Sequence, residues 1–166
     1  LPARLSRWKG QEDFIEIIDA LVKEGQDVHG VIVGGAHPKK QEYVRELQSA
    51  IDDRGLHQQI TMVGHRTDLK EILSFSNIVF SLSTEPEAFG RTTIEALSLG
   101  TPVIGYNHGG VKEQLEQLLP EGAIPVGKFG EAVTKVREWL PNPLRPGRNH
   151  LFTLDLMCCP TLNVYQ

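Results

Sequence analysis

The chain has 166 residues, which suffices for one domain with a substantial core. A 40% hydrophobic and 23% charged composition is that of an ordinary globular protein, and the net charge of −4 without lysine-arginine runs argues against a nucleic-acid or membrane-surface footprint. Adjacent Cys158 and Cys159 suit neither a structural bridge nor a metal site. We therefore expect a reduced, cytoplasmic setting, and the sequence shows no signal-peptide pattern or membrane-length apolar run.

Short apolar runs alternate with amphipathic segments along the chain. The predicted strands are the tail of a first strand at 1–5, followed by 28–33, 60–63, 78–82, 102–106 and 123–126. The predicted helices span 11–24, 38–54, 68–75, 92–99, 111–118 and 131–140. Strands that are apolar on both faces predict an α/β fold, a doubly wound, Rossmann-like parallel sheet with helices on both faces. Ligands of such sheets bind at the carboxyl ends of the strands.

The composition changes after Leu140. Prolines and a glycine at Pro141, Pro143, Pro146 and Gly147 indicate a linker, and residues 152–165 show helical apolar spacing despite an internal proline. We therefore divide the chain into a domain at 1–140 and a linker with a C-terminal helix at 141–166.

Residues 83–97 carry the most informative pattern. A predicted buried strand leads into an acidic loop with Glu87, and Gly90 then precedes a helix that contains Thr92 and Glu95. The free amides at a helix N-terminus favour an anion such as phosphate, and carboxylates can bind sugar hydroxyls. The alternative is structural: Thr92-x-x-Glu95 also fits a capping box, in which Glu95 only satisfies a backbone amide.

Several motifs in order resemble the retaining glycosyltransferases of the GT-B fold, family 4 type (glycosyl transferases group 1). They are Glu87-x7-Glu95 with Phe89-Gly90, then Ala96-Leu97-x-x-Gly100-x-Pro102-Val103, Gly109-Gly110-x-x-Glu113, and Ala3-Arg4-Leu5 with Lys9-Gly10. The resemblance extends to about Leu140. It implies one half of a GT-B fold, the C-terminal domain that binds the donor.

The resemblance implies the transfer of a sugar from a nucleotide-diphosphate donor, with retention of anomeric configuration. The implied partners are a nucleotide sugar, the missing N-terminal acceptor domain, and an acceptor glycan or lipid-linked glycan, with peripheral membrane association through the missing domain. The enzyme would be a hexosyltransferase of glycan biosynthesis, and this fragment alone would be inactive. A nucleotide-sugar-binding module without turnover and a GT-B epimerase are the alternatives, since both would keep the phosphate site.

The resemblance also assigns roles to residues. Arg4 and Lys9 would embrace the diphosphate leaving group, Glu87 would hold the donor sugar, and Glu95 would bind the ribose. The remaining donor-binding candidates are Phe89, Gly90, Arg91 and Thr92 beside the sugar and phosphate, Gly109 and Gly110 as a second set of amides, and His65 and Arg66 beside the base. A plain strand-helix turn is the alternative at Gly109-Gly110.

Two expectations concern charge. The histidines show no metal spacing, and Asp52-Asp53 is not the Asp-x-Asp pattern of metal-dependent transferases, so we expect neither a catalytic metal nor a cofactor. Arg4 and Lys9 have no acidic partner nearby in the sequence, which predicts exposed loop charges with little effect on stability.

Thr67 or Asp68 is predicted to cap the helix at 68–75.

Overall fold

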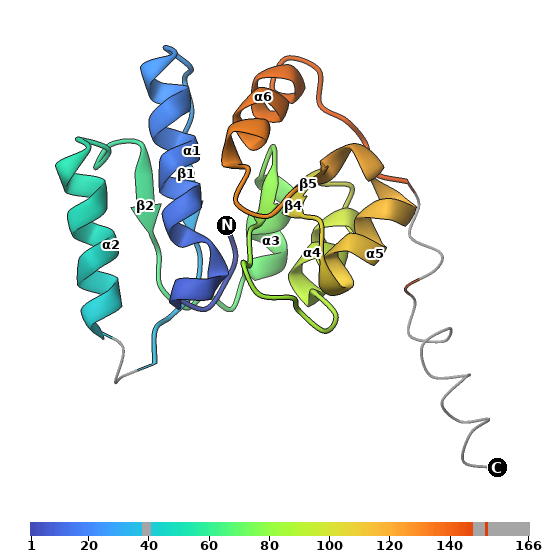
Figure 1. The fold of residues 1–166 in the computed structure, drawn as a ribbon, viewed down its shortest axis with the longest axis horizontal. Coiled ribbons are helices and arrows are strands. Elements are labelled where there is room, and N and C mark those ends of the chain that lie inside the picture. The colour runs from blue at the N-terminus through green and yellow to red at the C-terminus, as the bar shows by residue number, and fades with distance from the viewer. Residues whose placement is uncertain (38–40, 148–151, 153–166) are drawn as a thin grey trace.

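The structure, a computed structural model, describes residues 1–37, 41–147 and 152 (Figure 1). The predicted helix at 152–165, apart from Phe152, and the cysteine pair lie outside these residues. The division of the chain at residue 141 stays a prediction.

Within the described residues the strands form two parallel sheets. One pairs β1 (Gly30–Ile32) with β2 (Ile60–Met62), and the other has the order β3 (Val79–Ser81), β4 (Val103–Tyr106), β5 (Ala123–Ile124). The first predicted strand is reduced to one parallel bridge, between Pro2 and Val33. The α/β class is confirmed, but a single continuous sheet is not what the described residues form.

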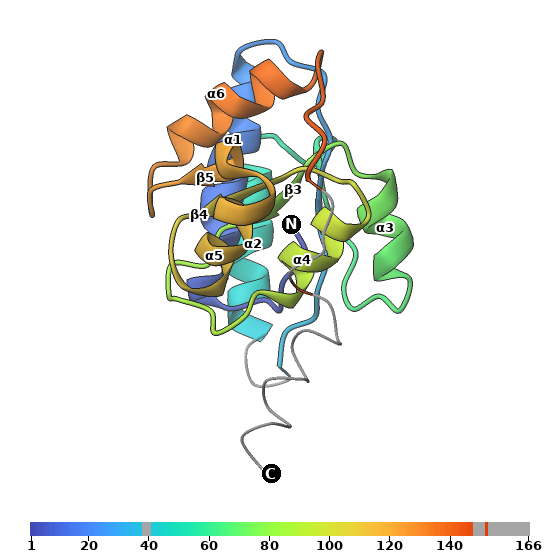
Figure 2. The same ribbon diagram turned by 90° about the vertical axis from the view of Figure 1, so that its right-hand side faces the viewer.

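Six α-helices of the described residues cover the strands. They are α1 (Gln11–Lys23), α2 (Gln41–Asp53), α3 (Leu69–Phe75), α4 (Arg91–Ser98), α5 (Gly109–Leu118) and α6 (Phe129–Trp139), with 3-10 turns η1 (Arg7–Lys9) and η3 (Pro120–Gly122). Helix α1 packs against α2 and α6, whereas α4 packs against α3 and α5. Figure 1 shows α1 and α2 on one side of β4 and β5 and α5 on the other, and the view of Figure 2, turned by 90°, shows α6 beside α1 and α3 beside α4. This is the predicted Rossmann-like arrangement with helices on both faces.

The helices form because each has one apolar stripe to bury. In α1 the apolar stripe of Phe14, Ile17, Ile18 and Leu21 is buried, and Phe14 meets Phe80 of β3 edge-to-face with ring centroids 5.3 Å apart. Strands β3 and β4 are buried on both faces, since all of their residues are buried, whereas Thr61 of β2 is exposed. The core therefore lies between the strands and both helical layers, and the loops at the carboxyl ends of the strands remain outside it.

Among the described residues, no helix is long and apolar enough to cross a membrane.

Candidate functional site

The loop after the first bridge, residues 4–10, brings Lys9 to the carboxyl end of β3. Gly10 makes this approach possible: its φ of +72° lies in the left-handed region, and a Cβ there would lie 2.1 Å from the carbonyl oxygen of Leu82. The Lys9 ammonium lies 2.8 Å from Oε1 of Glu87 and 4.1 Å from the centre of the Trp8 ring. The expectation that Lys9 is an exposed charge without an acidic partner is therefore wrong, because folding supplies a partner distant in sequence. Arg4 is exposed, as expected.

A hydrogen bond and an ion pair connect the loop between β3 and α4 to the loop at residues 4–10. The Thr84 amide donates a 2.8 Å hydrogen bond to the carbonyl of Trp8. The ion pair of Glu87 with Lys9 is a second link, and the two side chains are only 22% and 13% exposed. Two loops that are far apart in sequence thus form one wall, with the charges of Lys9 and Glu87 partly withdrawn from water.

A cavity of about 390 Å³ opens beside this wall at the carboxyl end of β3. It collects five of the predicted site residues: Arg4, Lys9, Glu87, Arg91 and Thr92. Its other lining residues come from the chain start and the end of β3: Leu1, Pro2, Ala3, Phe80, Ser81, Leu82 and Ser83. Three cationic side chains and one carboxylate therefore line the same cavity.

Helix α4 begins at the edge of this cavity. Gly90 occupies the N-cap with a φ of +75°, and the helix starts at Arg91. Thr92 therefore lies inside the helix, so the capping-box alternative, which needs Thr92 at the N-cap, is wrong. Glu95 is exposed, which leaves its carboxylate accessible to a ligand. The Thr93 amide already donates to the Gly90 carbonyl at 3.1 Å, but the first-turn amides before it have no intrahelical acceptor and can receive an anion here.

Gly109 and Gly110 start α5 and lie directly against the acidic loop. The Gly110 amide donates a 2.8 Å hydrogen bond to the carbonyl of Glu87. A Cβ on Gly109 would lie 2.5 Å from the same carbonyl oxygen, and one on Gly110 would lie 2.6 Å from Cα of Phe89. These contacts give the glycine pair a supporting role for the loop. Direct contact of their amides with phosphate stays a prediction.

His65 and Arg66 do not line this cavity. The guanidinium of Arg66 makes two hydrogen bonds to the carboxylate of Asp68, at 2.8 and 2.6 Å. This hydrogen bonding raises the pKa of Arg66 and lowers the pKa of Asp68. Asp68 occupies the N-cap of α3, one of the two predicted positions, but its side chain makes no capping bond because its carboxylate accepts the hydrogen bonds of Arg66 instead. The assignment of His65 and Arg66 to the base stays a prediction.

Sequence reasoning missed three polar residues that hold the acidic loop. The hydroxyl of Ser83 donates to Oε1 of Glu87, Nε2 of His108 lies 2.7 Å from the carbonyl oxygen of Ser83, and the Gln114 amide donates to the carbonyl of Phe89. Ser83 and Glu87 are four residues apart in an irregular loop, where spacing predicts no contact. His108 and Gln114 belong to α5 and its start, and only the packing of α5 on the loop reveals them.

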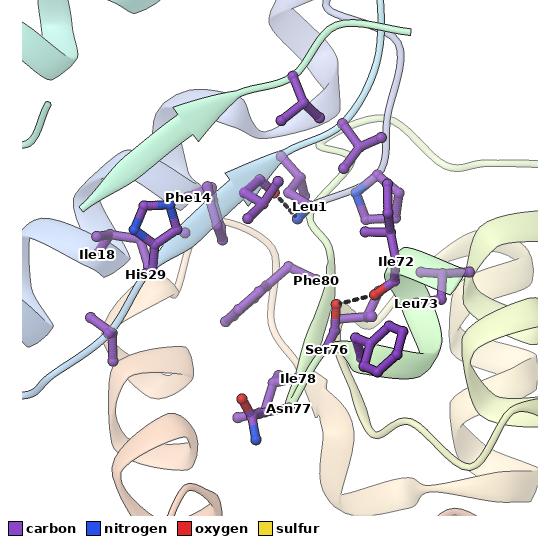
Figure 3. A pocket seen from close by; sticks show the side chains of 18 of the residues that line it. Leu1, Phe14, Ile18, His29, Ile72, Leu73, Ser76, Asn77, Ile78 and Phe80 are labelled. Carbon is purple, nitrogen blue, oxygen red and sulfur yellow. Dashed lines mark hydrogen bonds between the residues drawn. The ribbon is translucent and has the colours of Figure 1, made fainter. Parts of the chain in front are cut away.

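A larger cavity lies elsewhere, between β1 and β3 (Figure 3). It has a volume of about 690 Å³ and is lined mainly by apolar side chains of α1, α3 and the two strands, including Phe14, Ile18, Ile72 and Phe80. Arg66 is the one predicted site residue among those that line it. A diphosphate needs several cations or amides, so the smaller cavity is the better candidate.

No group of three or more His, Cys, Asp or Glu side chains in the described part of the chain could hold a metal ion. Metal independence of the reaction stays a prediction.

The fold and the smaller cavity define an α/β domain with a cationic, anion-accepting site at the carboxyl ends of its strands. Residues 2–151 match the family described as glycosyl transferases group 1, and the chain belongs to this family. It is therefore a glycosyltransferase group 1 domain.

Individual relatives and solved structures are also similar to this chain. A trehalose synthase of Pyrococcus horikoshii is 30% identical over 146 residues, which are 85% of this chain and 34% of the relative. The crystal structure of Anabaena HepE in complex with UDP and glucose superposes with a TM-score of 0.78 at 30% identity, covering 84% of this chain and 37% of HepE. The C-terminal domain of a group 1 glycosyl transferase, LpcC of Francisella tularensis, shares the fold, with a TM-score of 0.71 at 24% identity over 86% of this chain and 73% of that domain.

The chain spans 39% and 34% of the length of two curated relatives, a 2-deoxystreptamine glucosyltransferase of Streptomyces kanamyceticus and the trehalose synthase.

Proposed function

We propose that this chain is the donor-binding domain of a retaining, family 4 type glycosyltransferase with the GT-B fold, and that it binds a nucleotide-diphosphate sugar. The observation that carries the proposal is the cavity of about 390 Å³, which gathers Arg4, Lys9 and Arg91 with Glu87 at the start of α4. Cations and helix amides suit a diphosphate, and a carboxylate suits sugar hydroxyls. Structures of Anabaena HepE with UDP and with UDP-glucose make the uridine nucleotides the probes of choice.

The chemistry assigned to the cavity is stabilisation of a leaving group. As the bond between the sugar and the diphosphate breaks, negative charge grows on the β-phosphate and positive charge grows on the sugar ring. Arg4, Lys9 and the first amides of α4 would stabilise the phosphate before the reaction begins, at little reorganisation cost. Glu87 would hold sugar hydroxyls and favour the ring charge.

The complete enzyme is proposed to be a hexosyltransferase that needs no metal. Its acceptor, a glycan or lipid-linked glycan, would be bound by an N-terminal domain, so this chain alone should bind a nucleoside diphosphate without transferring sugar. Efficient transfer by the chain alone would contradict the two-domain arrangement.

The two glutamates provide the test of this donor assignment. Glu95→Gln should weaken binding of both UDP and UDP-glucose by about tenfold to a hundredfold, because a charge-assisted contact to ribose contributes about 1.5–3 kcal/mol. Glu87→Gln should weaken UDP-glucose by a similar factor. It should leave UDP affinity equal or higher, because the ion pair of Glu87 with Lys9 is lost and the ammonium becomes free for phosphate.

Isothermal titration calorimetry measures both affinities for each variant. Glu116→Gln is the matched control, since Glu116 is an exposed carboxylate on α5 paired with Lys112 at 3.7 Å and does not line the cavity. Equal losses of UDP and UDP-glucose affinity in Glu87→Gln would show that Glu87 does not contact the sugar.

A further inference from the structure

The hydrogen bond and the shortest ion-pair contact of the Glu87 carboxylate both fall on the same oxygen. Oε1 accepts the hydroxyl of Ser83 and lies 2.8 Å from the ammonium of Lys9. Oε2 accepts no hydrogen bond from any of the described residues. Since a carboxylate oxygen can accept from more than one donor, the arrangement commits Oε1 to the protein and leaves Oε2 for a ligand.

Ser83 is itself fixed in place. It is 4% exposed, and its carbonyl oxygen lies 2.7 Å from Nε2 of His108, which must carry the proton for this bond. At the other end of the same turn, the carbonyl of Glu87 accepts the Gly110 amide at 2.8 Å. The backbone between Ser83 and Glu87 is therefore attached to the start of α5 at both ends. A hydroxyl on this fixed turn can orient a flexible glutamate side chain.

The two donors on Oε1 differ in what a ligand would do to them. The ammonium of Lys9 lines the cavity and would be drawn toward a diphosphate, whereas the hydroxyl of Ser83 is neutral and belongs to a buried residue. When phosphate is bound, Ser83 is therefore the donor that keeps Glu87 in its present orientation.

We infer that Ser83 is a positioning residue that orients the Glu87 carboxylate so that Oε2 faces the sugar of a nucleotide sugar. The inference rests on the proposed function and deepens it. It predicts a selective effect: loss of the Ser83 hydroxyl should affect the sugar half of the ligand and spare the diphosphate half.

The test is calorimetric titration of the chain with UDP and with UDP-glucose. Ser83→Ala should weaken UDP-glucose by about threefold to tenfold, the value of one hydrogen bond, and leave UDP unchanged. Thr84→Ala is the matched control, because Thr84 carries the neighbouring hydroxyl but directs it toward the Trp8 carbonyl. Thermal unfolding of each variant shows whether it is folded, and Ser83→Thr, which keeps the hydroxyl, should restore UDP-glucose affinity.

A double-mutant cycle separates positioning from a general structural effect. If Ser83 acts through Glu87, then Ser83→Ala should have no further effect in a Glu87→Gln background, where orientation of a carboxylate no longer matters. Additive losses, or equal losses for UDP and UDP-glucose, would overturn the positioning role. Failure of the unaltered chain to bind UDP at all would instead overturn the proposed function on which it rests.

Discussion

Replacement of Gly10 by alanine is expected to lower the free energy of unfolding by about 2–5 kcal/mol. Two causes add: a left-handed backbone costs a residue with a Cβ about 1–2 kcal/mol, and overpacking costs about 1–3 kcal/mol. The overpacking is severe in this position, since the new Cβ would lie 2.1 Å from the carbonyl oxygen and 2.5 Å from Cβ of Leu82. Neither atom belongs to a flexible side-chain end, so the loop that carries Lys9 must move away from β3.

Gly25→Ala is the matched control for this prediction. Gly25 has a similar φ of +78°, but a Cβ there would meet no atom within 4 Å. Gly25→Ala should therefore lower the free energy of unfolding only by the cost of the left-handed backbone, about 1–2 kcal/mol. Urea unfolding followed by circular dichroism measures both variants, and equal losses would show that the close approach of Gly10 to Leu82 does not stabilise the fold.

The second large effect, a loss of UDP affinity, is expected from Arg4→Ala and Lys9→Ala, singly and in the double variant. If both side chains contact the diphosphate, each contact contributes about 1.5–3 kcal/mol, and each single replacement should weaken UDP by about tenfold to a hundredfold. Uridine, which has no phosphate, should bind as before. In the complete enzyme, turnover should fall more than ground-state affinity, because charge on the phosphate grows toward the transition state.

Stability changes should differ between the two positions. Arg4 is exposed, so its replacement should leave the free energy of unfolding nearly unchanged. Replacement of Lys9 removes the ion-pair partner of Glu87 and should lower the free energy of unfolding by about 1 kcal/mol, a value reduced by partial exposure of the pair. Arg7→Ala is the control cation from the same segment, because it pairs with Glu46 at 2.7 Å and does not line the cavity. Unchanged UDP affinity in the double variant would end the diphosphate role of Arg4 and Lys9.

Sequence patterns predicted the elements because their causes are local. Helix α1 begins one residue after Gly10 and ends two before Gly25, and its apolar stripe is visible in the sequence spacing. Apolar β-branched runs likewise predicted the strands. The separation into two sheets was not predictable, since pairing of strand edges depends on tertiary contacts rather than on a local pattern.

The candidate site, like the fold, could be predicted only in part. Order in the chain placed Glu87, Gly90 and Thr92 at the carboxyl end of β3, because a parallel sheet brings such loops to one edge. The ion pair of Lys9 with Glu87 and the hydrogen bond of Ser83 with Glu87 were not predictable, since both depend on how loops pack. Asp68 shows the same limit: it occupies the N-cap of α3, but the neighbouring guanidinium of Arg66 takes its carboxylate in place of a capping hydrogen bond.

The diphosphate of a nucleotide sugar is proposed to bind in the cavity at the carboxyl end of β3. Titration of the ¹⁵N-labelled chain with UDP, followed by amide chemical shifts, locates the diphosphate. We expect the largest shift changes at Lys9, Arg91 and Thr92, all of which line the cavity of about 390 Å³. Changes centred instead on His29 and Asn77, which line the cavity of about 690 Å³ between the sheets, or no changes at all, would contradict it.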